Sequence, residues 1–373
     1  MYFRLRMVAL FIGEKLMREI SRSNPKIFDT LLKKSSTYWQ VVRKIRAFLR
    51  YPSASALWNL IKLSASYITH SERTWGLPAH VKIDVSPNCN LRCPVCPHGT
   101  MTKHERRRVG TEMNLERFCS IIDQLKGRTL FASLYNLGEP LLNRDIFKMI
   151  RYAENNRIGT YITSNLSLKI SDKMIDDIFA SGLTLLIVGI DGVSSGTYGK
   201  ARRRGDWETV RENLVRVASR KRELGAIFPF LQIQFFCYPG NLHEHDDVRR
   251  FASENFIDEV SFIPGNSTPW LLAQRPRPDL QAKKNAMRPA CAWPYFSMLI
   301  MNDGRVLPCC KFRLDYHYGD DDSLDMGDTS ISTLVEIYGA GPYRVARSLV
   351  STPTKMRDMP THFCKGCSVL CQN

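Results

Sequence analysis

The sequence lacks the features that mark several specialised classes of protein. It has no apolar run near the roughly 18 residues that cross a bilayer, no internal repeat and no low-complexity tract. Residues 7–13 are apolar, but Glu14 and Lys15 follow at once without a small-residue cleavage site, so no secretory signal is predicted. With 373 residues, 44% hydrophobic and 24% charged, the chain has an ordinary globular composition and is long enough for more than one domain.

Acidic residues are scarce relative to basic ones. The formal net charge is +17, and residues 1–80 contain 14 Lys and Arg against 4 Asp and Glu. Such a bias favours contact with nucleic acid, an anionic membrane surface or an acidic partner, and a well-solvated helical extension is the alternative. The basic excess lies apart from the cysteines and no aromatic RNA-binding motif appears, which disfavours nucleic acid.

The 11 cysteines are not spread along the chain as a disulfide framework would be. Most fall in two groups, at 89–96 and at 291–371. Without a secretory signal we expect a cytoplasmic protein, and in reducing cytosol clustered cysteines serve metal or redox chemistry more often than disulfides. Cys119 and Cys237 stand alone in helix-like and strand-like stretches and are expected to be buried core thiols.

The first predicted domain is a basic helical extension over residues 1–78. Apolar residues recur at spacings of three and four in three stretches, 3–20, 38–50 and 55–68, as on one face of a helix. Pro25 and Pro52 separate these stretches, and residues 75–78 read as a linker. Basic amphipathic helices of this kind suit a peripheral position at a membrane surface, so we expect residues 1–75 to contact a membrane or an acidic partner.

The second predicted domain, residues 79–265, alternates short apolar strands with helical stretches. We expect strands at 81–86, 130–137, 159–165, 184–192, 230–236 and 260–264. About six such units predict an α/β fold with a parallel sheet and helices outside it, open or barrel-like. In these folds the site lies at the carboxyl ends of the strands. Cysteine, glutamate, asparagine and aspartate residues follow the first four strands.

The first cysteine group has the spacing C-x3-C-x2-C, formed by Cys89, Cys93 and Cys96. A structural zinc site needs four protein ligands. A cubane iron–sulfur cluster also takes four, one per iron, so three neighbouring thiolates leave one iron open for a substrate or cofactor. The alternative is a zinc knuckle whose fourth ligand lies elsewhere, for example at His98 or His104.

This motif, placed after the first strand of a βα series, resembles the signature of the radical S-adenosylmethionine (SAM) superfamily. The resemblance implies a partial (β/α)6 TIM-like barrel over residues 79–265. It also implies a [4Fe–4S] cluster on the three cysteines, SAM bound at the open iron, and a reductase or flavodoxin-type electron donor. Reduction would cleave SAM to a 5′-deoxyadenosyl radical that abstracts hydrogen from a substrate.

Further motifs support the resemblance. Residues 136–140 resemble the family's Gly-Gly-Glu motif, with Leu137 in place of the first glycine. The resemblance implies that Gly138, Glu139 and Pro140 contact SAM, with the carboxylate accepting hydrogen bonds from its ammonium group. Ser164 and Asn165 fall where the family contacts the ribose. A simple turn is the alternative at both places.

The fourth strand and the helix after it carry the remaining SAM motifs. Asp191 lies in a stretch that resembles the family's S-x-D-G segment, where backbone lines the cofactor. Arg202 ends a Y-x3-R stretch and would clamp the SAM carboxylate, because a guanidinium fork fits a carboxylate. Arg203 and Arg204 adjoin it, so the register stays open, and a solvated basic turn is the alternative.

The third predicted domain, residues 266–373, contains the second cysteine group. Cys291 and Cys309 flank Gly304 in a C-x12-G-x4-C pattern, and a terminal cysteine run follows. This resembles the SPASM/Twitch region of radical SAM enzymes, in the form with one auxiliary [4Fe–4S] cluster. The implied ligands are Cys291, Cys309, Cys364 and Cys367, with Cys371 as a replacement for one of the last pair. A terminal zinc ribbon is the alternative.

The auxiliary cluster implies a radical SAM oxidoreductase, since such a cluster can accept the second electron of a net oxidation. No catalytic base is assigned: Cys310 occupies the position of the family's aspartate, and Asp303, Asp315 and residues 320–322 are undistinguished candidates.

The substrate is predicted from the N-terminal extension. Peptide-modifying relatives usually begin with a strand-based recognition domain, whereas residues 1–75 read as helices. The sequence therefore favours a sugar, cyclitol or lipid-linked small molecule. A peptide-maturing enzyme is one alternative, and a zinc-dependent nucleic-acid-binding protein is an alternative of another class.

Overall fold

The structure is a computed structural model that describes residues 50–51, 53–100, 110–264, 281–282, 289–310, 326–358, 364, 367 and 369–372. Contacts divide the chain into two units, residues 1–50 and 51–373, and the second is described below. The helices predicted at 3–20 and 38–50 lie outside the described residues, apart from residue 50. The helix predicted at 55–68 is confirmed as α3 (Ala54–Ile68), capped by the Ser53 side chain.

A parallel sheet forms the centre of this unit. Its strands pair in chain order: β1 (His80–Ile83), β2 (Phe131–Ser133), β3 (Gly159–Ser164), β4 (Leu185–Ile190), β5 (Phe230–Cys237) and β6 (Glu259–Pro264). Strand β4 (LLIVGI) is almost continuously apolar and buried, as expected where both faces of a parallel sheet are covered. The six predicted strands and their parallel order are confirmed: β1 to β4 end earlier than predicted, and β5 and β6 are each one residue longer.

The sheet continues beyond β1 into the C-terminal part of the chain. Strand β8 (Ser297–Ile300) pairs in parallel along all of β1, and β9 (Arg305–Leu307) and β10 (Gly327–Asp328) add antiparallel strands. The nine strands form an open sheet with β10 and β6 at its edges. The architecture is therefore a partial, unclosed α/β barrel, as predicted, whose sheet the C-terminal segment extends.

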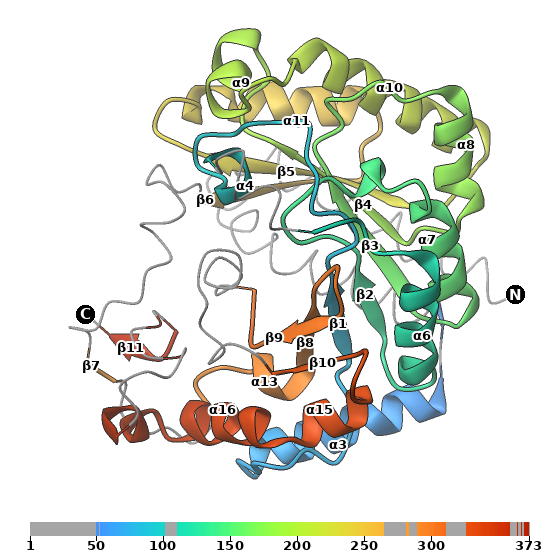
Figure 1. The fold of residues 1–373 in the computed structure, drawn as a ribbon. Coiled ribbons are helices and arrows are strands. Elements are labelled where there is room, and N and C mark those ends of the chain that lie inside the picture. The colour runs from blue at the N-terminus through green and yellow to red at the C-terminus, as the bar shows by residue number, and fades with distance from the viewer. Residues whose placement is uncertain are drawn as a thin grey trace, which may run out of the picture. The chain divides into compact units, whose positions relative to one another are not determined.

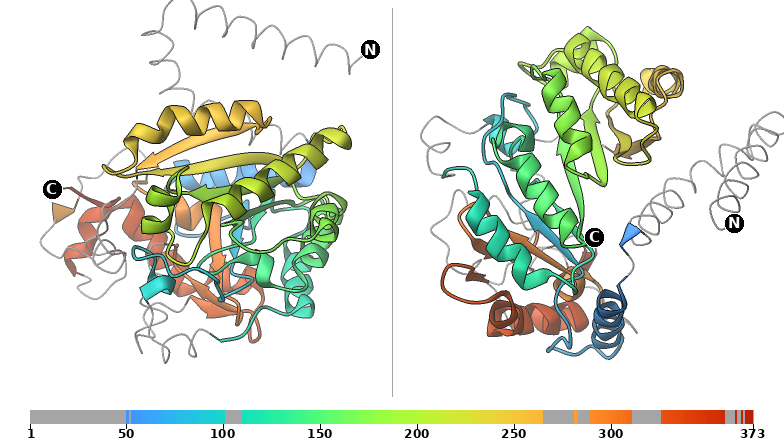
Figure 2. Two further views of the ribbon diagram at one scale, coloured as in Figure 1. Left: turned by 90° about the horizontal axis from the view of Figure 1, so that it is seen from above. Right: turned by 90° about the vertical axis from the view of Figure 1, so that its right-hand side faces the viewer.

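Helices lie along the outside of this sheet (Figure 1 and Figure 2). They are α6 (Leu115–Leu125), α7 (Ile146–Asn155), α8 (Asp172–Ala180), α9 (Ser195–Ala201), α10 (Trp207–Glu223) and α11 (His245–Glu254). Local chemistry sets where several begin: the Asn114, Ser171 and Asp206 side chains each accept a hydrogen bond from a first-turn N–H. Helix α10 then buries Trp207, Val210, Leu214 and Val217 against the core.

Four further helices gather at the lower side of the view in Figure 1. They are α3, α13 (Trp293–Phe296), α15 (Leu334–Gly339) and α16 (Gly341–Ser351), followed by η4 (Pro353–Asp358). The Tyr67 ring of α3 meets Tyr295 of α13 edge-on at 5.3 Å. A two-stranded ladder joins β7 (Gln281–Ala282) to β11 (Cys371–Gln372). No helix among the described residues has the length and apolarity to cross a bilayer.

Candidate functional site

The first cysteine group lies in the loop after β1. Cys89, Cys93 and Cys96 are free thiols, and Cys93 is buried. The loop folds back on itself: the Leu91 N–H donates to Cys89 Sγ at 3.4 Å, and the Cys96 N–H donates to the Cys93 carbonyl at 3.1 Å. A short helix, α4 (Pro97–Thr100), follows directly. Three thiols are thus presented by one compact turn at the carboxyl edge of the sheet.

Burial controls the charge of two of these thiols, Cys89 and Cys93. It raises the pKa of Cys89 to about 12, and the nearby carboxylate of Glu139 and the other two thiols add to the rise. Burial likewise raises the pKa of Cys93 to about 11, although the Arg202 guanidinium acts in the opposite direction. Thiols in such surroundings are protonated without metal, and binding to iron or zinc would release their protons.

The motif after β2 packs directly on the strand that leads to these cysteines. A Cβ on Gly138 would lie 1.9 Å from the carbonyl oxygen of Ser86 and 2.5 Å from that of Asn88. The Glu139 N–H donates to the same Asn88 carbonyl at 2.7 Å. Only glycine permits this approach of two backbones. The G-E-P motif therefore fixes the position of the segment that carries Cys89.

Glu139 joins the ends of two strands. Its carboxylate is buried and accepts hydrogen bonds from the N–H groups of Leu141 at 3.1 Å and Asn165 at 2.7 Å. Burial raises its pKa to about 7, against these hydrogen bonds, which lower it. Pro140 opens the short 3-10 helix η1 (Pro140–Leu142). Each carboxylate oxygen already has one backbone donor, in addition to any donor from SAM.

The residues after β3 contact the cysteine loop. Asn165 Nδ2 donates to Asn90 Oδ1 at 2.9 Å and lies 3.9 Å from Cys89 Sγ. The Ser164 hydroxyl accepts a hydrogen bond from the Leu166 N–H at 3.0 Å. This hydrogen bond closes a turn at the end of β3, which is the alternative to a ribose contact at this residue. The structure therefore brings Cys89, Glu139 and Asn165 together, although 76 positions separate the first from the last.

Arg202 forms an ion pair with Asp191 between its Nε and an aspartate oxygen, and both side chains are mostly buried. A Cβ on Gly189 would lie 3.0 Å from Arg202 Nη2, so the glycine of β4 makes room for the guanidinium. Arg203 and Arg204 are exposed. Of the three arginines, Arg202 is therefore the one beside Cys93, and its charge is already balanced in part by Asp191.

Sequence analysis did not identify several buried side chains that hold the strand-end loops. Asn143 Nδ2 donates to the carbonyls of Val85 and Met113, at 2.7 and 3.0 Å. Asn213 likewise donates to two loop carbonyls, and Asn241 donates to one carbonyl after β4 and one in β5. The sequence contains one feature that could have identified such a residue, which is an asparagine on the apolar face of a helix. Asn213, among the buried residues of α10, is an example.

Buried polar atoms suggest that a polar ligand fits this edge of the sheet. Ser86 Oγ, Asn136 Oδ1 and Thr163 Oγ1 lie at the ends of β1, β2 and β3, and the described part of the structure offers them no hydrogen-bond partner. Buried polar atoms are normally satisfied, so a ligand with donors and acceptors accounts for them. The same edge carries the three thiols, so a metal cluster with a polar cofactor fits the residues present.

The second cysteine group is only partly assembled among the described residues. Cys291, Cys364 and Cys367 pack around the apolar cluster formed by Tyr295, Leu349 and Val350. The charge of Cys309 adds to the effect of burial in raising the pKa of Tyr343, which places this thiol near α16. Cys310 packs on a different cluster with Leu299 and Met301. The backbone of Cys371 lies in β11, and its side chain is outside the described residues.

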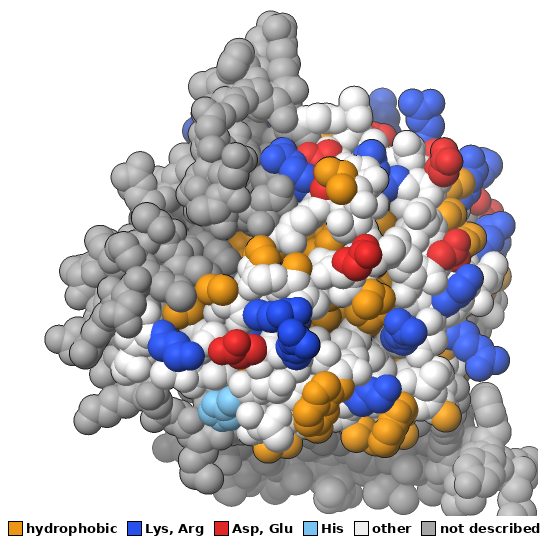
Figure 3. All heavy atoms as spheres, turned by 60° about the horizontal axis from the view of Figure 1, so that its bottom comes forward, with side chains coloured by type: hydrophobic (Ala, Val, Ile, Leu, Met, Phe, Trp, Pro, Cys, Tyr) orange, Lys and Arg blue, Asp and Glu red, His pale blue; other side chains and the backbone are white. Residues whose placement is uncertain are grey.

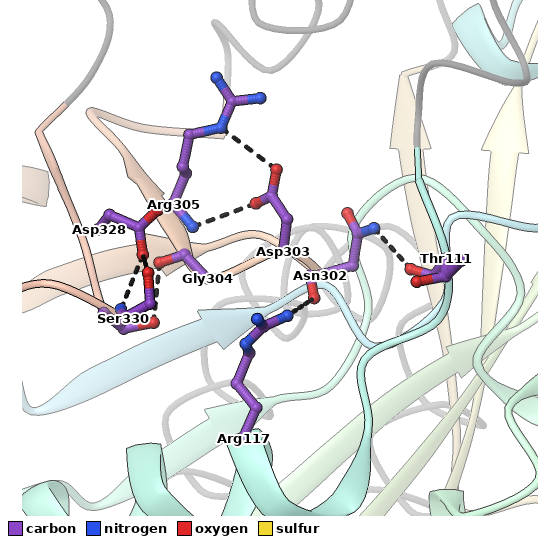
Figure 4. Close-up of polar contacts among 9 residues, drawn as sticks. Thr111, Arg117, Asn302, Asp303, Gly304, Arg305, Asp328 and Ser330 are labelled. Atoms are coloured by element: carbon purple, nitrogen blue, oxygen red, sulfur yellow. Dashed lines mark hydrogen bonds and ion pairs between the residues drawn. The ribbon is translucent and has the colours of Figure 1, made fainter.

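The glycine of the C-x12-G-x4-C pattern forms the turn between β8 and β9 (Figure 4). Gly304 has φ +101°, and a Cβ there would lie 2.7 Å from Thr329 Oγ1. Asp303 accepts a hydrogen bond from the Arg305 N–H and pairs with its guanidinium at 3.2 Å. This contact shows that Asp303 stabilises the turn. It does not support a role for Asp303 as the catalytic base. Asp315 and residues 320–322 lie outside the described residues.

Two further expectations concern a zinc ligand and the isolated cysteines. In the described ranges, no three His, Cys, Asp or Glu side chains lie close enough to hold a single metal ion. His98 is buried and His104 lies outside the described residues. Cys119 and Cys237, expected in the core, are half-buried.

Two family models match the regions that contain most of the clustered cysteines. The family model described as the radical SAM superfamily matches residues 83–231, and the model of the SPASM iron–sulfur cluster-binding domain matches residues 291–368. The chain therefore contains a radical SAM domain followed by a SPASM domain. The cofactors of the radical SAM domain are SAM and a [4Fe–4S] cluster, and the SPASM domain binds auxiliary iron–sulfur clusters.

Individual members of the radical SAM superfamily resemble the chain at low identity. The PqqA peptide cyclase of Bradyrhizobium diazoefficiens is 21% identical over 202 residues, which cover 54% of this chain and 50% of that protein. The GTP 3′,8-cyclase of Desulforamulus reducens is 24% identical over 199 residues, covering 51% and 58%. The crystal structure of Streptococcus suis SuiB bound to precursor peptide SuiA has a TM-score of 0.56, at 15% identity, over 78% of this chain and 71% of that one. The chain spans about half the length of the curated relatives it matches first.

Proposed function

We propose that this radical SAM enzyme modifies a peptide, with one auxiliary cluster assisting the reaction. The observation that supports the peptide substrate is the match, at 21% identity over 202 residues, to a PqqA peptide cyclase. The helices predicted over residues 1–75 are the reason for expecting a sugar, cyclitol or lipid-linked substrate. Only α3 of that segment is described, and a single helix gives no argument against a peptide.

The residues that would hold the first cluster are Cys89, Cys93 and Cys96. When bound, the cluster and SAM supply a 5′-deoxyadenosyl radical that abstracts hydrogen from the substrate. Gly138 lets the backbone of the G-E-P segment approach, while Glu139, Ser164 and Asn165 form the adjoining wall. These contacts place polar groups at fixed positions on rigid strand ends, which orients a cofactor without further reorganisation.

Arg202 would hold the negative end of SAM. Its guanidinium has five N–H donors and uses Nε on Asp191. Arg202 also lies close enough to Cys93 to lower the pKa of that thiol, against the effect of burial. Asp191 acts as a positioning residue in this proposal, because the ion pair fixes the fork that meets the carboxylate.

The auxiliary cluster would be held by Cys291, Cys309, Cys364 and Cys367, with Cys371 as the alternative to one of the last pair. A cluster at this position accepts the second electron of a net oxidation, which makes the oxidoreductase class part of the proposal. A flavodoxin-type or other reductase would supply the first electron. The division of the chain into three domains, with boundaries after residues 78 and 265, remains a proposal. Strand β8 pairs with β1, so the two cysteine-containing regions share one sheet.

An anaerobic reconstitution tests the cofactor assignment. We expect about eight irons in the wild type and about four in a Cys89/Cys93/Cys96→Ala variant, with 5′-deoxyadenosine formed from SAM and dithionite only by the wild type. Equal iron in both proteins, or zinc without iron, would show that the first cysteine loop is structural.

The substrate class is tested separately with the same reconstituted enzyme. Short peptides encoded beside its gene are incubated with SAM and reductant, and their masses are compared with those from the three-cysteine variant. A mass change that requires the intact loop supports a peptide substrate. A change confined to a parallel panel of sugars, cyclitols and nucleotides would overturn the peptide assignment and leave the radical SAM assignment standing.

A further inference from the structure

Helix α3 exposes an apolar face to solvent. Leu57, Trp58, Ile61 and Ile68 are 45, 58, 48 and 68% exposed, and they lie within about 100° of one another around the helix. The opposite face, which packs on the protein, buries Ala56, Asn59, Leu63 and Ser66. The helix therefore buries the polar Asn59 and Ser66 beside Ala56 and Leu63, while four large apolar side chains stay exposed, which is unusual for a surface helix.

Buried hydrogen bonds fix this orientation. Asn59 Nδ2 donates to the carbonyls of Leu77 and Arg128, at 2.7 and 3.0 Å, and Asn59 Oδ1 accepts a hydrogen bond from the Leu77 N–H at 2.9 Å. The Tyr67 hydroxyl donates to the Pro289 carbonyl at 2.9 Å. Rotating α3 to bury its apolar face would break all four bonds and leave polar atoms unsatisfied. The apolar face is therefore held outward by the fold itself.

A second tryptophan and basic groups extend the surface. The Trp75 N–H donates to Ser66 Oγ at 3.1 Å, which holds Trp75, 55% exposed, beside the carboxyl half of α3. Lys62 Nζ lies 5.8 Å from the centre of the Trp58 ring. Figure 3, which brings this side forward, shows apolar side chains with Lys and Arg side chains among them. Tryptophan, aliphatic and basic side chains together are typical of segments that lie in a membrane interface.

We propose that the α3 face, defined by Leu57, Trp58, Ile61, Ile68 and Trp75, docks the enzyme on an anionic lipid bilayer. Two observations favour a bilayer over a second copy of the chain. The face is a single convex helix side, which suits a flat, deformable surface. Residues 1–50, which lead into α3, carry 12 Lys and Arg against 3 Asp and Glu. Two such segments would repel each other across a symmetric interface, whereas anionic headgroups attract them.

The inference is independent of the substrate proposed above. The bilayer contact involves α3 and the turn at Trp75, whereas the cysteine loop follows β1 at the carboxyl edge of the sheet. The vesicle assay described next can succeed or fail whether the substrate is a peptide or a small molecule. Failure of the bilayer proposal is therefore distinguishable from failure of the peptide proposal.

The test is co-sedimentation of the full chain with vesicles of phosphatidylcholine alone and of phosphatidylcholine with phosphatidylglycerol. We expect binding to the anionic vesicles, weakened by added salt, with a blue shift of tryptophan emission. A Trp58→Ser/Ile61→Ser variant should bind at least about tenfold more weakly, because it removes two inserted side chains. The matched control is Ile331→Ser, an 85% exposed apolar residue on another element, which should bind as the wild type does.

Three results of the vesicle assay would overturn the proposal. They are no binding of the wild type to anionic vesicles, equal binding of the double variant, and equal loss in the Ile331→Ser control. Sedimentation velocity without vesicles is run in parallel, and wild-type self-association that the double variant abolishes would assign the face to a second copy instead. All substituted side chains are exposed, and thermal unfolding confirms that each variant is folded.

Discussion

Gly138 shows how one absent side chain fixes the site. A Cβ would meet two backbone carbonyls at 1.9 and 2.5 Å, and neither can move without displacing the strand end that leads to Cys89. We expect Gly138→Ala to cost about 1–3 kcal/mol of unfolding free energy and to lower iron binding. Denaturant unfolding and iron analysis measure both effects. Gly199→Ala in α9, where a Cβ meets nothing within 4 Å, is the control and should be neutral or slightly stabilising. Equal effects would contradict this view of Gly138.

The ion pair between Asp191 and Arg202 makes a large electrostatic contribution to the free energy of unfolding. The exposed fractions of the two side chains are 5% and 17%, so removing either partner leaves a largely buried charge. We expect Asp191→Asn to cost about 3–5 kcal/mol, measured by denaturant unfolding. In the double variant Asp191→Asn/Arg202→Gln neither charge remains, and part of the loss should return. Additive losses would show that the two residues act independently.

At the scale of single elements, Glu244 holds the start of α9 from the 3-10 helix η2 (Leu242–Glu244). Its carboxylate accepts hydrogen bonds from the Val193 N–H and from the hydroxyls of Ser194 and Thr197, at 2.8, 2.7 and 2.6 Å. Burial alone would raise its pKa, but these donors outweigh burial and hold the pKa below its usual range. The loop that follows Asp191 is thereby tied to a distant part of the chain.

This lowered pKa has a definite consequence for stability. A carboxylate with a lower pKa in the folded state contributes stability above its unfolded pKa, and the contribution is lost as pH falls through the folded value. We expect Glu244→Gln to destabilise by about 1–3 kcal/mol at pH 7, with the difference from wild type shrinking below about pH 4. Unfolding at both pH values measures this. Glu208→Gln, an exposed residue paired with Arg211, is the control, and a pH-independent difference for Glu244→Gln would contradict the assignment.

At the scale of the whole molecule, the two cysteine regions share one sheet. Strand β8 pairs with all four residues of β1, and Val81, Ile83, Met298 and Ile300 are fully buried there. We expect a chain that ends at Pro264 to aggregate, because it exposes the apolar edge of β1. Size-exclusion chromatography measures this outcome. A chain that begins at Tyr51 is the control and should stay monodisperse, since residues 1–50 form a separate contact unit. A monodisperse, folded chain ending at Pro264 would show that the first region folds alone.

The sequence by itself determined what depends on local patterns. The spacing of Cys89, Cys93 and Cys96 indicated an iron–sulfur site, and alternating apolar and helical segments predicted the parallel sheet, because both signals lie within a few residues of chain. The helix at 54–68 was predictable for the same reason. Its outward apolar face was not, because periodicity identifies an apolar stripe without showing which side packs on the protein.

Only the tertiary structure decided the arrangements that join distant parts of the chain. The pairing of His80 with Ser297 spans 217 positions, and the hydrogen bond from Asn165 to Glu139 spans 26. Such contacts depend on which backbone groups remain unpaired once the strands have formed, and no local pattern encodes that. For the same reason the motifs predicted which residues surround Cys89, whereas the structure decided that Asp191 holds Arg202 and that Asn59 holds α3 with its apolar face outward.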